Sequence, residues 1–537
     1  TNGSGNFTIN SDLQAENDII VRNNNSGQLT LNGDLDTGGN TITFDGVGDA
    51  ASENGSIFGS GDLIKNDAGT LTLAGGNTYT GTTEINGGTL VAANDTALGT
   101  TAAGTTIGAG GTLSLTNDIA IGAEALANAG VLENTSGTNS FAGVVSGTGD
   151  VDVAGGQLTL SGNNSYSGTT DIASGATLVA TNDNSLGSTA GDTTIASGGT
   201  LSLTNNIAVG AETLTNNGTL VNTSGTNSFG GDISGSGGVT LTEGGLTLSG
   251  AGSYSGTTTI GDGTLTLGAS DAIGSTSDLS IASTGVLDLA GNSQAVGDLS
   301  VGEGATLDFG TPGGANTFLF DTYTPPPSGI FVINNWEDGV DQLATTVASQ
   351  DVSSVYLSGI GVAEQQVGLT ALGGSYGNGY LLTPVSATHK EWDGSVNKGW
   401  RNNNNWTTPV EPTSTQIALF DDLGDGQPLV NLNDSYTIAG IQFGALGTVG
   451  YDIYDKLNAG HVLTLDGAIP YIQQQSDNDQ LIRIVELELG NNTIADITGA
   501  GDLTIAANIT EVGGENNSLV RDGAGDGKLI LSGDNSF

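Results

Sequence analysis

Internal repetition limits how this chain can fold more than any other feature of its sequence. Residues 105–141 and 193–229 match at 28 of 37 positions without a gap. The octapeptide at 134–141 returns unchanged at 222–229, an offset of 88 residues. A repeat of this length indicates stacked structural units rather than several separate globular cores.

A shorter period lies inside the long repeat. Leucines that open short strand phrases recur at Leu71, Leu90, Leu113, Leu132 and Leu158, and the last of these steps is the longest. In a third copy, leucines recur at similar intervals, at Leu246, Leu265, Leu287 and Leu307. We therefore expect four coils of about 22 residues in each long repeat. This period predicts an all-β fold, a right-handed parallel β-helix (β-solenoid) of about 20–22 residues per coil.

The composition fits this coil geometry. Thr, Val, Ile and Leu alternate with polar residues because one face of a coil wall points inward and the other faces water. The 90 glycines among 537 residues, together with asparagines, supply corners with positive φ. Aromatic residues make up only 5% of the chain and charged residues only 12%. Neither several globular cores nor a disordered polyelectrolyte is therefore indicated.

The texture of the sequence changes near residue 311, because all nine prolines and all four tryptophans lie between Pro312 and Pro470. Within this window, Val362 to Leu372 is the stretch that favours a short helix. We expect five segments along the chain: N-terminal solenoid coils at 1–61, a β-solenoid with 88-residue repeats at 62–310, an insert or junction at 311–390, a Trp-rich cassette start or cap at 391–435, and a second solenoid segment, truncated in mid-repeat, at 436–537.

The charge balance excludes several classes of partner. The chain carries 57 acidic and 9 basic residues, a net charge of −48. Nucleic acids and anionic membranes both require Lys and Arg, so we expect neither as a partner. The absence of cysteine excludes disulfides and thiol chemistry, and the absence of methionine indicates a processed product or a piece of a longer chain. No apolar run approaches the ~20 residues of a membrane-spanning helix, so we expect no membrane insertion in this segment.

Several phrases recur in a fixed order and carry a family resemblance. They include Gly69-Thr-Leu-Thr-Leu73, Asn77-Thr-Tyr79-Thr-Gly81-Thr-Thr83, Gly88-Thr-Leu90-Val91 and Ala97-Leu98-Gly99. This pattern resembles the autotransporter-associated β-strand repeat, also called the passenger strand-loop-strand repeat, strongly over about 62–310. Residues 390–537 resemble the opening of a second cassette. The resemblance implies a large secreted β-helical passenger on the surface of a bacterium with an outer membrane, with an adhesive or structural role.

The residues that could carry catalysis are sparse. Neither of the two histidines, His389 and His461, has a neighbouring serine or carboxylate pattern typical of a triad. A polysaccharide lyase on a β-helix would need basic residues, and residues 1–389 contain only Arg22 and Lys65. We therefore predict that the chain is not an enzyme and has no catalytic, cofactor-binding or metal-binding residues.

Calcium needs separate consideration because the chain is acidic. The segments 421–426 and 522–527 are spaced like calcium loops but lack an oxygen ligand at the third position. We interpret both as turns. Diffuse Ca²⁺ binding by the acidic surface is the expected cation interaction, without a defined cofactor.

Two sets of residues are candidates for contacts with other molecules. Trp392, Trp400, Arg401 and Trp406 form a candidate ligand or junction surface, either a platform for sugars or, as we favour, a cap that closes an apolar solenoid end. Solenoid ends carry unpaired backbone groups that template another chain. The candidate end-to-end assembly contacts are Phe7, Ile9, Leu529, Leu531 and Phe537.

These observations lead to one hypothesis and two alternatives. We expect a non-enzymatic extracellular structural or adhesive β-solenoid that stacks head to tail with itself into a filament of the bacterial cell surface or biofilm matrix. Its other partners would be surface glycans or other cells. One alternative is a surface-binding protein in which the solenoid is a stalk for a glycan- or protein-binding module at 311–435. The other is a polysaccharide-degrading β-helix enzyme.

Overall fold

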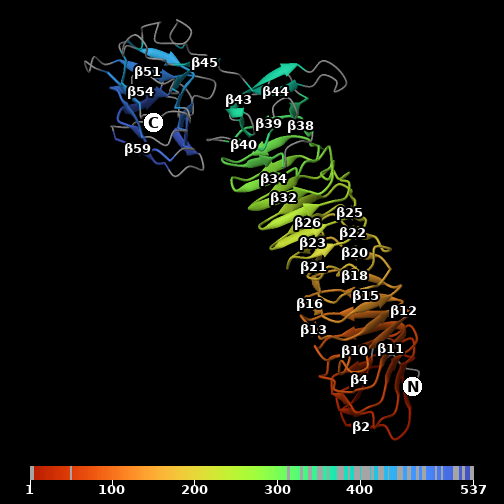
Figure 1. Cartoon of the computed structure of the whole chain (residues 1–537). Coiled ribbons are helices and arrows are strands. Elements are labelled where there is room, and N and C mark those ends of the chain that lie inside the picture. Colours follow the sequence, from red (N-terminus) through yellow and green to blue (C-terminus); the bar gives the residue numbers. More distant parts are fainter. Residues whose placement is uncertain are drawn as a thin grey trace. The chain divides into compact units, whose positions relative to one another are not determined.

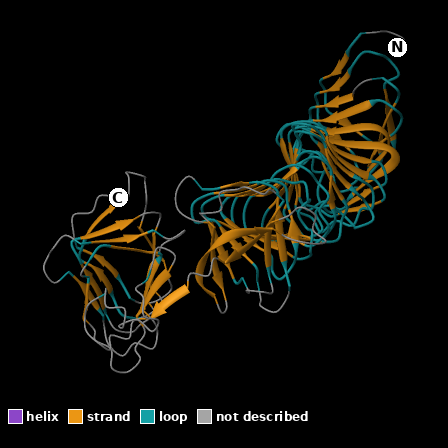
Figure 2. Cartoon of the chain, turned by 90° about the horizontal axis from the view of Figure 1, so that it is seen from above, coloured by secondary structure: helices purple, strands orange, loops and turns teal. Residues whose placement is uncertain are grey.

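The computed structural model contains strands and loops but no helix in the residues that it describes (Figure 2). These residues are 5–48, 51–310, 315–326, 331–336, 341–346, 355–359, 362–371, 380–384, 388–391, 400, 412, 416–420, 429–432, 434–443, 451–455, 461–466, 471–474, 479–489, 493–497, 500–511, 519–522 and 527–532. The chain divides into two compact units. Unit 1 is Thr1–Thr324 with Gly339–Val347, and unit 2 is Pro325–Asp338 with Ala348–Phe537. No described helix is available to cross a membrane.

Unit 1 is a parallel β-solenoid in which each turn adds one segment, in most turns a strand, to each of three walls (Figure 1). Wall 1 begins with β1 (Phe7–Ile9), β4 (Leu29–Leu31), β7 (Ala51–Glu53), β10 (Thr70–Leu73) and the second halves of β11 (Thr83–Ala92) and β12 (Thr105–Leu115). It continues through β15 (Val131–Asn134), β18 (Asp150–Val153), β20 (Thr170–Ile172), β22 (Thr193–Ile195), β25 (Leu214–Asn216), β28 (Ile233–Ser234), β35 (Gln294–Ala295), β38 (Thr317–Phe320) and β41 (Gln342–Thr345).

The other two walls are built in the same way. Wall 2 contains β2 (Leu13–Gln14), β5 (Leu35–Asp36), β8 (Ile57–Phe58), β13 (Ala120–Ile121), β16 (Thr138–Phe141), β19 (Gln157–Leu160), β21 (Thr177–Ala180), β23 (Thr200–Leu203), β26 (Thr219–Asn222), β29 (Gly238–Leu241), β31 (Thr258–Ile260), β33 (Leu279–Ile281), β36 (Leu299–Val301) and β39 (Tyr323–Thr324). Wall 3 contains β3 (Ile19–Arg22), β6 (Ile42–Asp45), β9 (Leu63–Lys65), the first halves of β11 and β12, β14 (Leu126–Asn128), β17 (Val145–Gly147), β24 (Ala208–Val209), β27 (Thr226–Phe229), β30 (Gly245–Leu248), β32 (Gly263–Leu267), β34 (Gly285–Asp288) and β37 (Thr306–Asp308).

The core of unit 1 is a set of stacked apolar side chains, one from each successive turn. Leu71, Leu90, Leu113 and Leu132 lie in register on wall 1, and all four are fully buried. The residues beside them alternate outward, as the sequence pattern predicts. Each buried leucine contributes about 1.5–3 kcal/mol relative to an exposed one. The stacking therefore confirms the β-solenoid that the sequence predicts.

The long repeat does not contain four whole coils, and that expectation was wrong. Val151, not Leu158, stacks on Leu132. Leu158 instead lies on wall 2, so the long step from Leu132 to Leu158 is a change of wall. Counting each half of β11 and β12 and the two wall segments around Tyr79 and Leu98, thirteen wall positions separate β10 from the equivalent β19, which is four and one-third turns of the solenoid.

Each long repeat therefore advances the motif by one wall. The Leu-Thr-Leu phrase lies on wall 1 in β10, on wall 2 in β19 and on wall 3 in β30. The equivalent buried tyrosines follow the same rule, because the backbone beside Tyr79 bonds to β8, that beside Tyr166 to β17, and that beside Tyr254 to β28. Equivalent surfaces thus face three directions around the axis of unit 1.

Each of the identical octapeptides forms a solenoid corner followed by a wall strand, β16 or β27. The Asn139 side-chain amide donates to Asn134 Oδ1 at 2.7 Å and to the Ser136 carbonyl at 2.7 Å. Gly137 between them has φ of +81°, a conformation that glycine adopts without strain. The same bonds join Asn227, Asn222 and Ser224 in the next repeat. The strict repetition therefore has a structural cause.

Unit 2 contains β40 (Phe331–Asn334) and β42 (Val355–Gly359), which pair in parallel. The predicted helix at 362–372 is wrong. Residues Val362–Ala371 form strand β43, which pairs antiparallel with β42 and with β44 (Tyr380–Pro384). Pairing on both sides outweighs the weak local helix preference of this stretch.

The rest of unit 2 repeats the three-walled plan with longer and less even turns, since Ile417 pairs with Gly440 and Gly440 with Tyr471. One sheet contains β45 (Thr388–Glu391), β46 (Gln416–Phe420), β49 (Gly440–Phe443), β52 (Tyr471–Gln474), β55 (Thr493–Ile497) and β58 (Leu519–Asp522). The second contains β47 (Leu429–Asn431), β50 (Asp452–Tyr454), β53 (Gln480–Arg483), β56 (Leu503–Ile505) and β59 (Leu529–Leu531). The third contains β48 (Tyr436–Ile438), β51 (Val462–Leu465), β54 (Glu486–Leu489) and β57 (Asn508–Glu511).

Candidate functional site

The predicted assembly contacts at the N-terminal side lie on strand β1 of wall 1. Phe7 is 62% exposed and Ile9 is half-buried, whereas Leu31, the register partner of Ile9 one turn later, is 2% exposed. The apolar interior of the solenoid is therefore less covered at β1 than one turn further on. An assembly contact at Phe7 and Ile9 stays a prediction.

The predicted contacts at the C-terminal side lie on strand β59 of unit 2. Leu529 is half-buried and Leu531 is 38% exposed, whereas their register partners Leu503 and Ile505 are fully buried. Phe537 lies outside the described residues. Strand β59 thus presents apolar side chains to solvent in the same way as β1.

Of the four residues of the predicted ligand or junction surface, the structure describes Trp400. Its side chain is fully buried, and its ring centroid lies 6.0 Å from that of Phe420 and 5.5 Å from that of Tyr436. A ring in this position packs in the core of unit 2 and does not offer a face to a sugar in solution. Trp392, Arg401 and Trp406 lie outside the described residues, and a ligand or junction surface there stays a prediction.

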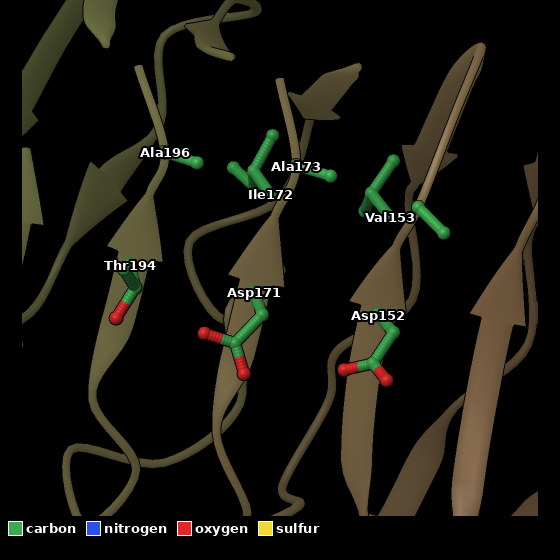
Figure 3. Close-up of a pocket in the computed structure, with 8 residues that line it drawn as sticks. Asp152, Val153, Asp171, Ile172, Ala173, Thr194 and Ala196 are labelled. Carbon is green, nitrogen blue, oxygen red and sulfur yellow. The ribbon is translucent and has the colours of Figure 1, made fainter. Parts of the chain in front are cut away.

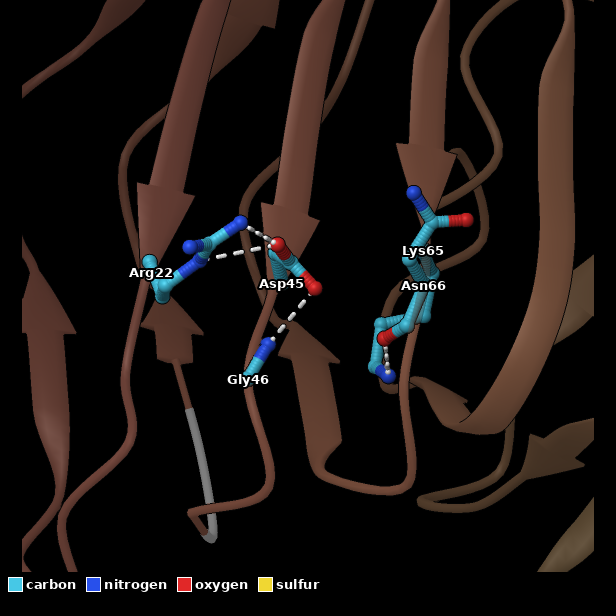
Figure 4. Close-up of polar contacts among 5 residues, drawn as sticks. All are labelled: Arg22, Asp45, Gly46, Lys65 and Asn66. Atoms are coloured by element: carbon cyan, nitrogen blue, oxygen red, sulfur yellow. Dashed lines mark hydrogen bonds and ion pairs between the residues drawn. The ribbon is translucent and has the colours of Figure 1, made fainter.

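Both cations of the first 389 residues have structural roles (Figure 4). Arg22 Nε donates to Asp45 Oδ2 on the next turn at 2.9 Å. Lys65 is 3% exposed and donates to the carbonyls of Asp67 at 2.8 Å and Gly87 at 3.1 Å. Burial lowers the pKa of Lys65. These contacts use both cations within the solenoid itself.

The structure shows polar contacts of His461 that the sequence did not indicate. His461 Nδ1 lies 3.0 Å from the Leu432 carbonyl and 3.4 Å from Asp455 Oδ1. The side chain of His389 lies outside the described residues. So do 421–426 and most of 522–527, the segments spaced like calcium loops. Within the described segments, no three or more His, Asp or Glu side chains lie close enough together to hold a metal ion.

A row of carboxylates runs along the outer face of wall 1. Glu133, Asp152 and Asp171 are register partners on three successive turns, in β15, β18 and β20. Like charges directly opposite each other on neighbouring strands are destabilising, typically by a few tenths of a kcal/mol or more. The sequence did not reveal this row, because a whole turn of chain separates its members and only the strand register brings them together.

A groove of about 300 Å³ lies beside this row (Figure 3). In Figure 3 the carboxylates of Asp152 and Asp171 and the hydroxyl of Thr194 project from three adjacent strands on the same side. The groove is lined by Asp152, Val153, Ala154, Asp171, Ile172, Ala173, Thr194 and Ala196. Its surface thus combines small apolar side chains with carboxylates.

The environment of this groove perturbs the ionisation of one carboxyl. Burial, followed by the charges of Asp171, Asp150 and Glu133, raises the pKa of Asp152 to about 6. A carboxyl held in this range is partly protonated in mildly acidic surroundings, unlike the carboxylates of an ordinary surface. Among the described residues on the outer face of wall 1, Asp152 in this groove is therefore the carboxyl whose pKa is raised most clearly.

The next repeat shows that the fold does not require these charges. The residues equivalent to Glu133, Asp152 and Asp171, 88 positions later, are neutral. They are Val221, Thr240 and Thr259, and they form the same in-register row on wall 2. The acidic row is thus specific to one repeat.

Comparison with known proteins identifies the repeated element. A family model described as the passenger-associated-transport-repeat matches residues 63–92, 155–180, 234–267 and 524–537. Each of the first three segments contains a Leu-Thr-Leu strand followed by one of the buried tyrosines, on successive walls. The matches confirm the resemblance seen in the sequence and show that the family's repeat spans between one and two turns of this solenoid.

A curated relative carries the same kind of sequence. The Adhesin BmaC autotransporter of Brucella suis biovar 1 (strain 1330) is 37% identical over 105 residues. This match covers 19% of the present chain and 3% of that adhesin. The present chain thus matches only a small part of the relative's length.

Proposed function

We propose that this chain, because it carries passenger-associated-transport repeats, is a non-enzymatic adhesive and structural β-solenoid exposed on a bacterial cell surface. The observation that carries the proposal is the coincidence of the family's repeat with successive turns of a regular parallel solenoid. Solenoids of this kind offer long, stiff walls rather than a single catalytic cleft. The structural use of Arg22 and Lys65 also supports a role without catalysis.

A finer proposal concerns assembly. Copies of the chain stack head to tail into a filament of the cell surface or biofilm matrix, with Phe7 and Ile9 of one copy near Leu529, Leu531 and Phe537 of the next. The exposed apolar side chains of β1 and β59 support this arrangement, because strand edges with apolar side chains are templates for another chain. The net charge of −48 would oppose lateral clumping of such filaments.

Electron microscopy of the purified chain across a concentration series tests the assembly. We expect filaments that lengthen with concentration and shorten when Phe7→Lys and Leu531→Lys are combined. Val144→Lys is the matched control, because Val144 is 44% exposed in the middle of unit 1. A chelator arm reports whether diffusely bound Ca²⁺ strengthens the contact. Short isolated rods at every concentration would contradict stacking and favour a stalk.

Adhesion is tested separately by coating beads with the full chain and counting those retained by bacterial cells or by a layer of surface glycans. We expect retention several times that of beads coated with an unrelated protein of similar negative charge. The comparison matters because polyanions attract counter-charges without specificity. Equal retention of the two kinds of bead would contradict an adhesive role while leaving the structural role open to the microscopy result.

A further inference from the structure

Two buried glutamates lie inside unit 1 and have no part in the proposed adhesive surface. Glu124 is 1% exposed and Glu212 is 3% exposed, and they are 88 residues apart. Each lies two positions before a wall strand, Glu124 before β14 and Glu212 before β25. Carboxyl groups are rarely buried this deeply without a cationic partner.

Both carboxyl groups are held by the same local structure. Thr105 Oγ1 donates to Glu124 Oε1 at 2.7 Å, and Thr193 Oγ1 donates to Glu212 Oε1. Each threonine stacks on another threonine one turn earlier, Thr83 or Thr170. Thr83 and Thr170 are in turn hydrogen-bonded to the hydroxyls of the buried Tyr79 and Tyr166, at 2.6 and 2.7 Å.

The next turn closes over each glutamate. A β-carbon added at Gly143 would lie 1.6 Å from the Glu124 carbonyl oxygen, and one added at Gly231 would lie 1.7 Å from that of Glu212. The backbone is therefore packed directly on the backbone of the glutamate. Since both glutamates are almost fully buried as well, water reaches their carboxyls only when the surrounding chain opens.

The groups around the two carboxyls do not favour a negative charge. The titratable neighbours that act on Glu212 are the phenol of Tyr166 and the carboxylate of Asp192. Asp232 on the following turn is engaged elsewhere, because its Oδ1 accepts from the Ala251 amide. For Glu124 the titratable neighbour is Tyr79.

Burial dominates the ionisation of both groups. It raises the pKa of Glu212 to about 7, with a smaller contribution from Asp192, and the Thr193 hydrogen bond opposes the shift. Burial raises the pKa of Glu124 as well, opposed by the bond from Thr105. In the folded solenoid each carboxyl therefore holds its proton more tightly than an ordinary glutamate does.

The third repeat shows that the fold can form without the hydrogen-bonded threonine and glutamate. Leu279 takes the place of Thr193, stacked on Thr258 as Thr193 is on Thr170. Gly297, two positions before Leu299, takes the place of Glu212. Threonine and glutamate are thus replaced together, by leucine and glycine. The carboxyl is an addition to this core rather than a requirement of it.

We propose that Glu124 and Glu212 are internal pH-sensing groups that hold neighbouring turns closed in acid and loosen the solenoid at two levels as the pH rises out of the acidic range. Protonated, each carboxyl is a hydrogen-bonded part of the core. Ionised, it is less stable in the closed core than in water, so the equilibrium shifts toward opening of the adjacent turn. The two levels are the turns around β12 to β17 and those around β22 to β28.

The direction of the effect follows from proton linkage. The folded carboxyl binds its proton more tightly than the unfolded one, so the stabilisation is fully present below pH 4.5, the ordinary value for glutamate. It is lost as the pH rises through about 7 at Glu212. Between pH 5 and 8 the equilibrium for opening this level should increase on the order of 50-fold.

Hydrogen–deuterium exchange of the full chain at several pH values, corrected for intrinsic exchange rates, tests the proposal. We expect peptides covering 193–233 to gain exchange on the order of 50-fold between pH 5 and 8, and those covering 105–145 to gain in the same direction. Peptides covering 277–301 are an internal control, because Leu279 and Gly297 leave no buried carboxyl there.

Matched variants separate the carboxyl from a general effect of pH. Glu212→Gln keeps the shape and the hydrogen-bond acceptor, and should abolish the pH dependence at 193–233 while leaving 105–145 unchanged. Glu124→Gln should do the reverse. Two results would overturn the proposal: an equal pH dependence in the Gln variants, or an equal pH dependence at 277–301 in the unmodified chain. The comparison with 277–301 uses the unmodified chain, so it tests the proposal even if a variant fails to fold.

Discussion

Replacing Gly231 by alanine is expected to unfold the turns around it. The new β-carbon would lie 1.7 Å from the carbonyl oxygen of Glu212. Glu212 and Gly231 lie two residues before the paired strands β25 and β28, and the contact joins a β-carbon to a backbone oxygen, so no side-chain rotation relieves it. We expect a loss of about 3 kcal/mol or more, at the upper end of overpacking costs. Urea unfolding monitored by hydrogen exchange at 193–255 would measure it.

Gly76→Ala is the control for this substitution. The nearest atom to a β-carbon at Gly76 is Thr96 Oγ1, at 3.8 Å, an ordinary van der Waals distance. We expect a change within about 0.5 kcal/mol there, because the substitution meets no backbone. Because solenoid stability is a sum over neighbouring turns, the damage from Gly231→Ala should be local. Equal stability of the two variants would contradict the close stacking of turns on which the core depends.

Replacing Trp400 by alanine should have a comparable effect in unit 2. The indole is fully buried against Phe420 and Tyr436, and its removal leaves a large cavity. Truncation of a buried aromatic side chain typically costs about 3–5 kcal/mol. Chemical unfolding of the full chain, followed by hydrogen exchange in β46 to β48, would show the loss.

Trp400→Phe is the matched variant, since it retains an aromatic ring and should recover more than half of the lost stability. The same pair of variants distinguishes the two roles that the sequence suggested for this tryptophan. If Trp400→Ala leaves unit 2 as stable as before but abolishes binding to a glycan, the residue belongs to a ligand surface. The buried position predicts the opposite result.

The local elements of unit 1 were largely predictable. Short alternations such as Leu71-Thr72-Leu73 become strands with the leucines inside because the side-chain period of a strand is two. Positions with positive φ occur at glycines such as Gly137, where the sequence indicated corners. The failure at 362–371 has the opposite origin, since that strand depends on partners at 355–359 and 380–384 that a local reading does not include.

The candidate surfaces were less accessible to sequence reasoning. Carboxylates read along the chain are scattered, whereas the register of β15, β18 and β20 places Glu133, Asp152 and Asp171 in one row beside a groove. The buried positions of Glu124 and Glu212 were equally hidden. A glutamate between small residues looks like a solvated corner until the next turn is known to cover it.

The sequence by itself determined the fold class, the short strand period and the existence of the long repeat, because strand alternation, corners and self-similarity are all written in local order. Only the tertiary structure decided how that repeat lies around the axis. Thirteen wall positions distributed over three walls make four and one-third turns, so Tyr79, Tyr166 and Tyr254 lie on different walls. The number of strands in a turn depends on where the coil closes and pairs with the turn before it. That closure is a contact between residues one whole turn apart in the sequence, and no local pattern fixes it.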